Sequence, residues 1–316
     1  MASRPNDSGS IHLGTYSQQF LQQTVNLVQL GSIYGLLAVG FSMVYGIARL
    51  VNFAYGPIFM VSTYLLFFFG TLMSAMTETA WIVLVFALIG ASALTALLAI
   101  IIEKIAYKPL RGAPKVSVVV SSVGVGMALE YLVLSFIGPN PHRMPTFVGN
   151  SRYTVGGVNF SLATIIIVAV AVAAMVVLNL YIKKSRTGIA LRAVAEDGLA
   201  ASFMGISANW MISVAFILSA IMATIGASLY GVAYPTFNPY FGEQINWWSF
   251  TAAVLGGIGS VKGAILGGYL LAAVNVYSPM LLPTSSWRDV VAFGVLIFVL
   301  MIKPAGLIGK KRIEKV

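Results

Sequence analysis

Nine apolar runs divide this chain, and they restrict its fold more than any other feature of the sequence. They cover approximately residues 23–46, 57–73, 81–102, 116–137, 161–182, 208–231, 247–258, 263–281 and 287–303. A helix needs about 20 mostly apolar residues to cross the hydrocarbon core of a bilayer. The seventh run is too short to cross alone, which predicts a re-entrant segment or half of a broken helix. We therefore expect an all-α integral membrane protein, a polytopic bundle of eight or nine transmembrane segments.

The composition supports this interpretation and excludes several classes of soluble protein. Of the 316 residues, 59% are hydrophobic and only 9% are charged, whereas soluble domains carry about 25% charged residues. The chain has no cysteine, which excludes disulfides and thiolate metal sites. Its net charge of +10 would suggest nucleic acid in a soluble protein. Because the basic residues lie in loops, without an aromatic-interleaved patch, we expect no nucleic-acid partner.

The distribution of basic residues predicts how the chain is oriented in the membrane. Three segments are rich in Lys and Arg: 103–115, 183–206 and the tail from Lys303. The opposite loops hold only Arg143, Arg152 and Arg288. Because basic loops stay in the cytoplasm, we expect a polar N-terminal segment 1–20 outside, a transmembrane domain 21–306 and a basic cytoplasmic tail 307–316. Together with the bacterial character of a cysteine-free membrane chain, this predicts a multi-pass protein of the cell inner membrane.

Two irregular links interrupt the apolar pattern and supply candidate pathway residues. The first runs from Arg49 to Pro57 and the second from Gly256 to Gly263. Irregular backbone at membrane depth lines a cavity or is buried in protein, and paired Gly/Pro interruptions point to a transporter's binding pathway. Two ordinary tight turns are the alternative interpretation. The candidates from these links are Asn52, Tyr55, Gly256, Gly257 and Gly259.

Polar side chains inside the apolar runs form a second group of candidates. Glu130 is a carboxylate within the fourth run, where a central charge costs about 2.5–3.5 kcal/mol. It contacts substrate, pairs with another helix or sits protonated near the outer half of the span. Neutral amides are better explained as hydrogen bonds between helices: Asn26, Gln29, Asn52 and Asn275. Two small-residue motifs, Gly31-x-x-x-Gly35 and Gly263-x-x-x-Gly267, predict close helix packing.

The sequence shows no enzyme or nucleotide site. Lys262 follows Val261 and precedes Gly263, so the glycine-rich link does not match the G-x-x-x-x-G-K-[ST] phosphate loop. His12 and His142 lie in polar segments without metal-ligand spacing. We therefore expect no catalytic residue, metal or bound cofactor in this chain, and any ATP that drives it would be bound by another subunit.

The basic connector 183–206 contains the clearest candidate for a docking surface. Its middle is rich in alanine, which favours a helix, and Gly205 is a good position for that helix to end. Leu199, Phe203 and Met204 are spaced i, i+4 and i+5, so they share one side of a helix. This pattern predicts a short helix that lies in the groove of a soluble partner; a solvated linker is the alternative.

Several motifs together resemble the permeases of branched-chain amino acid ABC importers. They are the R-T-G-x-A-L-R-A-x-A-E-D pattern from Arg186, N-F-A-Y-G from Asn52, A-Y-K-P-L-R from Ala106, F-T-A-A-V-L-G-G-I-G-S from Phe250 and K-P-A-G-L-I-G from Lys303. The resemblance covers nearly the whole chain after the first 20 residues. Members more often carry His at Tyr55 and Gln at Glu130, and both differences bear on substrate choice.

The resemblance implies the partners and the role of the connector. The family works with a second permease subunit, two cytoplasmic ATPase subunits that bind ATP and Mg, and a periplasmic substrate-binding protein. It also implies that the connector is the coupling segment that docks on an ATPase. The residues concerned are Arg186, Arg192, Glu196, Asp197, Leu199, Phe203 and Met204.

Two other functions are compatible with a helix bundle of this kind. An ion-driven secondary transporter would show several intramembrane Asp, Glu or His residues as relays, and this chain has one clear example. A channel-like facilitator of small polar solutes would need no docking connector. A membrane enzyme is the weakest alternative, since no nucleophile and base form a pair.

Overall fold

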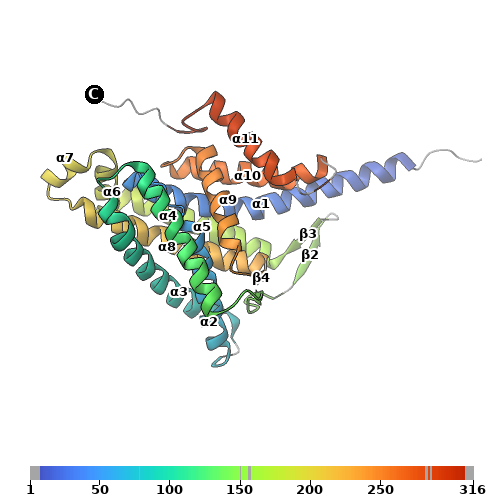
Figure 1. The fold of residues 1–316 in the computed structure, drawn as a ribbon. Helices are drawn as coiled ribbons and strands as arrows, with labels where there is room; N and C mark the ends of the chain where they lie inside the picture. Colours follow the sequence, from blue (N-terminus) through green and yellow to red (C-terminus); the bar gives the residue numbers. More distant parts are fainter. Residues whose placement is uncertain are drawn as a thin grey trace, which may run out of the picture.

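The protein is a bundle of long helices with two small sheets (Figure 1). The computed structural model describes residues 8–77, 79–149, 151–155, 158–281, 284 and 287–309. Seven of the helices in these ranges are long and apolar enough to cross a membrane, judged by length and composition. The predicted all-α polytopic membrane fold is confirmed.

The long helices account for most of the chain. They are α1 (Ser8–Ala48), α2 (Tyr55–Ser74), α3 (Ala80–Ile102), α4 (Lys115–Phe136), α5 (Leu162–Lys184), α8 (Ala208–Ala233), α9 (Phe241–Gly256), α10 (Val261–Leu281) and α11 (Arg288–Ile302). Helix α3 continues into a π-helical turn (Glu103–Tyr107) and a 3-10 turn (Lys108–Leu110). Two short helices, α6 (Arg186–Glu196) and α7 (Gly198–Phe203), form the connector.

Four short strands lie between the helices. Strands β1 (His142–Arg143) and β4 (Thr236–Phe237) pair antiparallel, with His142 opposite Phe237. Strands β2 (Arg152–Val155) and β3 (Val158–Ser161) form an antiparallel ladder, with Arg152 opposite Ser161.

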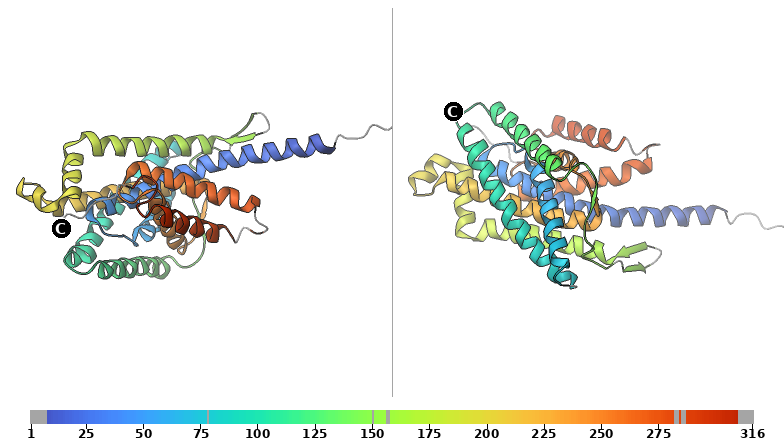
Figure 2. Two further views of the ribbon diagram at one scale, coloured as in Figure 1. Left: turned by 90° about the horizontal axis from the view of Figure 1, so that it is seen from above. Right: turned by 60° about the horizontal axis from the view of Figure 1, so that its bottom comes forward.

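The observed helices refine the predicted segments at two places. Helix α1 begins at Ser8 rather than near residue 23 and has 41 residues, because no proline separates Pro5 from Pro57. At 1.5 Å per residue it is about 60 Å long, and its N-terminal part projects from the bundle (Figure 2). Helix α9 is a helix of 16 residues and is not among the seven candidate spans. That the short seventh segment is re-entrant or half of a broken helix stays a prediction.

Helix α1 occupies the centre of the bundle. It packs against α5, α8, α9 and α10, and its side chains Leu36, Leu37 and Val39 are fully buried. Helices α4 and α5 are mostly exposed along their spans, and their exposed apolar side chains, such as Met127 and Val177, suit a lipid environment.

Glycines set the closest helix contacts, as the small-residue motifs predict. A Cβ on Gly31 would lie 2.5 Å from the Tyr269 ring, and one on Gly267 would lie 1.9 Å from the Ala252 carbonyl oxygen. Gly35 faces Ile265 across the same α1–α10 contact. The packing role of both motifs is therefore confirmed.

The bundle has two distinct ends, which we call the connector end and the strand end. The connector end holds α6, α7, the C-terminus of α1 and the start of α8. Arg49, directly after α1, donates to the Ala195 carbonyl oxygen of α6. Arg111 donates to Asn209 at the start of α8. At the strand end, Gln22 of α1 exchanges two hydrogen bonds with Asn159 of β3. The basic segments 103–115 and 183–206 thus share one end with Lys303, as the predicted orientation requires.

Candidate functional site

The connector is two helices rather than the single helix that its alanines suggest. Ser185 begins α6 by accepting a 2.8 Å hydrogen bond from the backbone N–H of Gly188. Asp197 separates the helices, because its carboxylate accepts from the N–H groups of Leu199 and Ala200 and so begins α7. The predicted stop is present, since α7 ends just before Gly205, which has φ +80°.

The connector residues named from the sequence are all exposed. Leu199 and Phe203 of α7 and Met204, directly after it, have 76%, 89% and 82% of their surface exposed, and α7 packs mainly on α6 and α8. Three exposed apolar side chains on six residues mark an interaction surface. The charged members of the set are exposed beside them: Arg186, Arg192, Glu196 and Asp197. We call these seven residues the coupling surface.

Arg49 ties this surface to the membrane helices. It follows the last residue of α1, has a left-handed backbone with φ 55°, and donates 3.1 Å hydrogen bonds to the carbonyl oxygens of Ala195 and Glu196. Both carbonyls belong to the last turn of α6. A displacement of α6 therefore acts directly on the loop between α1 and α2.

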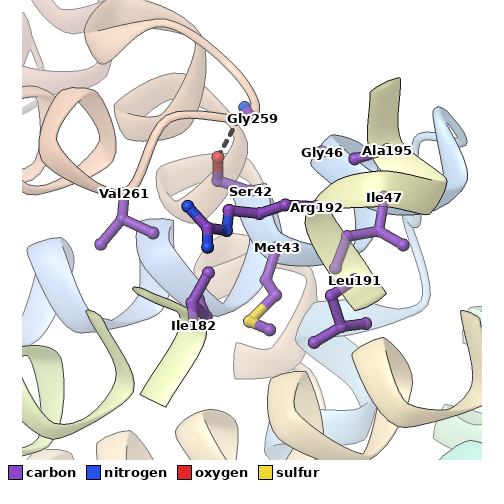
Figure 3. Close-up of a pocket in the computed structure, with 10 residues that line it drawn as sticks. All are labelled: Ser42, Met43, Gly46, Ile47, Ile182, Leu191, Arg192, Ala195, Gly259 and Val261. Carbon is purple, nitrogen blue, oxygen red and sulfur yellow. Dashed lines mark hydrogen bonds between the residues drawn. The ribbon is translucent and has the colours of Figure 1, made fainter. Parts of the chain in front are cut away.

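A cavity of about 100 Å³ lies beneath α6 (Figure 3). It is bounded by Ser42 and Met43 of α1, Leu191 and Arg192 of α6, and Gly259. Within it, the Gly259 N–H donates a 2.7 Å hydrogen bond to Ser42 Oγ. The cavity walls therefore belong to α6, the end of α1, the end of α5 and the turn and start of helix that follow α9.

The α9–α10 turn contains the candidates Gly256, Gly257 and Gly259, and close packing explains all three. Gly257 and Gly259 have positive φ values, 109° and 89°, and a Cβ on Gly256 would lie 1.8 Å from the Gly263 carbonyl oxygen. The C-terminal segment packs on the turn, where the Ile308 N–H donates to the Gly256 carbonyl oxygen.

Three backbone N–H groups of the same turn are used within the chain. Gly257 donates to Ala253, Gly259 to Ser42 and Gly263 to Ser260. A phosphate loop needs such groups pointing at the ligand, so these three are not placed for one.

The link between α1 and α2 is buried and its backbone is satisfied from within. Asn52 Oδ1 accepts from the Tyr107 hydroxyl and from the Ala54 N–H, while the Gly56 N–H donates to Asn246 of α9. The N-terminus of α2 thus has few groups left for a substrate. Tyr55 is buried against Phe41, and its hydroxyl has no partner in the described part of the chain.

The six pathway candidates lie at several places in the bundle. Tyr55 lies against Gly40 and Phe41, and Gly259 lies against Gly46 and donates to Ser42, the residue after Phe41. Glu130 is partly exposed on α4, within electrostatic range of Glu243 of α9. Their role in a pathway stays a prediction.

The amides named as helix–helix contacts behave as predicted in three of four cases. Gln29 accepts from Thr164 of α5, Asn275 donates to Tyr34 of α1, and Asn52 accepts from Tyr107. Asn26 is the exception, because it donates to Gln23 of its own helix.

The structure also brings together polar groups that the sequence did not single out. At the connector end, the buried Glu103 forms an ion pair with Arg111 and accepts from Ser213. The available signal was a lone carboxylate at the start of a basic loop. At the strand end, Gln23, Asn26, Gln29, Asn275 and Arg288 line one cavity; a single basic residue in a short outer link was the only signal for Arg288.

Comparisons with known proteins agree along almost the whole chain. The family model described as "Branched-chain amino acid transport system / permease component" matches residues 23–300. A high-affinity branched-chain amino acid transport system permease protein LivH from Salmonella typhimurium is 38% identical over 303 residues, 94% of this chain and 98% of its own. BraD from Pseudomonas aeruginosa, of the same description, is 37% identical with the same coverage. A probable LivH from Methanocaldococcus jannaschii is 26% identical and covers 87% of this chain and 88% of its own.

Proposed function

The chain belongs to the branched-chain amino acid transport system permease family, and from this premise we propose that it forms part of the membrane channel of an ATP-driven importer of branched-chain amino acids. The relatives' descriptions support the substrate class, and identity of 37–38% over 94% of the chain supports a shared architecture. The chain is a transport subunit, and its coupling surface is the means by which it receives energy.

The connector end faces the cytoplasm in this proposal. It carries most of the basic residues of the described loops: Lys104, Lys108, Arg111, Lys183, Lys184, Arg186, Arg192 and Lys303. The strand end carries Arg143, Arg152 and Arg288. Because basic loops remain on the cytoplasmic side, α1 begins outside and α11 ends inside the bacterial inner membrane.

The proposed partners are those that the family resemblance implies. Two ATPase subunits in the cytoplasm bind ATP and Mg and dock on the coupling surface. A second permease, homologous to this chain or a second copy of it, completes the channel, and a periplasmic binding protein delivers substrate to the strand end.

The mechanism assigned to this chain is mechanical. Phe203 and its two apolar neighbours enter a groove of the ATPase, and Arg49 transmits displacement of α6 to the α1–α2 loop. The Ser42–Gly259 hydrogen bond transmits the same movement to the α9–α10 turn. The ATPase pair shifts the permease between inward-open and outward-open states only by binding one state more tightly than the other.

One structural observation supports docking on an ATPase independently of the family. Three apolar side chains on and directly after α7 are exposed at the basic end of the bundle. Its test is Phe203→Ala in the complete reconstituted importer. Truncation of an aromatic interface anchor costs about 2 kcal/mol or more. We therefore expect substrate-stimulated ATPase activity and uptake to fall roughly tenfold or more, with normal membrane insertion.

Phe136→Ala is the matched control. Phe136 is 85% exposed, close to the 89% of Phe203, but it ends α4 at the opposite end of the bundle. It should leave stimulated ATPase activity unchanged. If Phe203→Ala matches the wild type as Phe136→Ala does, α7 does not dock on the ATPase.

A further inference from the structure

A polar cleft opens at the strand end between α1, α10, the start of α11 and Tyr234. We call it the strand-end cleft. Its volume is about 470 Å³, within the range of small-molecule sites. Helices α1 and α10 pack along each other there (Figure 1), and the Thr24 and Tyr277 hydroxyls join them by a 3.0 Å hydrogen bond. The cleft is therefore part of a fixed helix pair.

One wall of the cleft has a buried acceptor without a donor. Asn275 is only 3% exposed, and its side-chain N–H donates a 3.2 Å hydrogen bond to the Tyr34 hydroxyl. Its Oδ1 atom has no partner among the residues that the structure describes. A buried polar atom left unsatisfied costs about 1–3 kcal/mol, so this oxygen is suited to a donor that arrives with a ligand.

The positive charge of the cleft comes from Arg288. Arg288 is the only charged residue among the described residues that line the cleft, and its buried Nε also has no partner among them. The guanidinium lies within electrostatic range of the Tyr34 and Tyr234 hydroxyls. Arginine binds carboxylates through two parallel N–H donors, so this position is suited to a carboxylate.

Apolar side chains complete the lining. Leu30 and Ile33 lie on the α1 side and Val276 and Met280 on the α10 side. Towards the middle of the bundle, Tyr34 packs against Trp248 with ring centroids 5.1 Å apart. The cleft thus offers an unpaired acceptor, a cation and an apolar surface.

We propose that the strand-end cleft is the first binding site for substrate on this permease, with Arg288 holding the carboxylate, Asn275 Oδ1 accepting from the ammonium group and the α1 and α10 apolar side chains contacting the aliphatic side chain. A zwitterion with an apolar side chain supplies a partner for each of these three surfaces. The inference rests on the proposed function for the direction of transport and deepens it by naming the residues that meet the substrate.

The test is Arg288→Gln in the complete importer, with one wild-type binding protein used for every variant. We expect leucine uptake and leucine-stimulated ATPase activity to fall about tenfold, the size of a lost charge-assisted contact. Substrate-free ATPase activity should not change, because the coupling surface is at the other end. Arg288→Lys keeps the charge and should restore part of the uptake, whereas Arg143→Gln, at the same end but outside the cleft, should have no effect.

A second readout is retention of radiolabelled leucine by the permease–ATPase complex in nanodiscs without the binding protein, which Arg288→Gln should abolish. If Arg288→Gln does not assemble, Asn275→Ala decides the question on the same readouts. Wild-type uptake and retention in the variants would overturn this inference while ATP-dependent uptake stands. Absence of ATP-dependent uptake in the wild type would instead overturn the proposed function.

Discussion

At the scale of single residues, Glu103 is a buried carboxylate whose charge must be compensated within the bundle. It is 1% exposed, pairs with Arg111 and accepts a 2.7 Å hydrogen bond from Ser213. A buried pair adds little net stability, but removal of one partner leaves an uncompensated charge. Glu103 therefore fixes the position of the π-helical turn that ends α3 and, through Arg111, of the start of α8.

We predict that Arg111→Gln destabilises the protein by about 3–5 kcal/mol, the cost of breaking a buried ion pair. Glu103→Gln combined with Arg111→Gln should recover most of the loss, because no charge stays buried. Unfolding in mixed detergent micelles measures the free energy of unfolding of the single and the double variant. The exposed Arg186→Gln is the control. A double variant as unstable as Arg111→Gln would show that the charge is not the cause.

The sequence predicts the role of a single residue when that role shows in the spacing of its near neighbours along the chain. The spacing of Leu199, Phe203 and Met204 was sufficient to predict a common exposed face. Arg288 and Asn275 are separated by 13 positions, and their shared cavity depends on how α10 and α11 pack, which periodicity does not describe. Asn52 stands at an irregular link, and its oxygen accepts from Tyr107 and Ala54. The contact with Tyr107 depends on how distant segments pack, and a pathway role for Asn52 stays a prediction.

Among the elements, α7 depends on its first residue more than a long helix would. It has six residues, and helices this short are not stable on propensity alone. The Asp197 carboxylate satisfies two of the N–H groups that begin it. The cap therefore determines whether Phe203 is presented in a helical position.

We predict that Asp197→Asn preserves coupling and Asp197→Ala impairs it. Asparagine caps helices about as well as aspartate, whereas alanine costs about 1 kcal/mol. Substrate-stimulated ATPase activity of the reconstituted importer is the measurement. Equal impairment in the two variants would assign the role to the charge of Asp197 instead of its cap.

The close contact between α9 and α10 determines which residues the turn between them can accept. Helices α9 and α10 approach so closely at Gly256 and Gly263 that any side chain would displace backbone. We predict that Gly256→Ala sharply lowers the yield of folded protein, since its Cβ would lie 1.8 Å from the Gly263 carbonyl oxygen. Size-exclusion profiles and thermal unfolding measure this effect.

Gly294→Ala on α11 is the control for that substitution. No atom lies within 4 Å of its Cβ position, and alanine favours a helix interior over glycine by about 1 kcal/mol. It should be neutral or stabilising. A Gly256→Ala protein with wild-type stability would mean that α9 and α10 can separate at no cost.

At the scale of the whole molecule, hydropathy and charge predicted most of the architecture. Runs of apolar residues located the long helices, and the basic loops grouped 103–115 and 183–206 at one end, because both signals are carried by composition along the chain. The helix order around α1 and the division of the connector into α6 and α7 depend on contacts between distant residues. These include Gly31 with Tyr269 and Arg49 with Ala195, and no local pattern predicts them.

As an importer permease, this chain should move substrate only when an ATPase acts on its connector. The most direct measurement is leucine uptake into proteoliposomes that contain the permease subunits and the binding protein, with and without the ATPase subunits and ATP. Uptake should occur only in the complete, ATP-supplied vesicles and should fall with Phe203→Ala. Sustained uptake by the permease subunits without any ATPase would contradict the account and identify a channel-like facilitator or an ion-driven transporter.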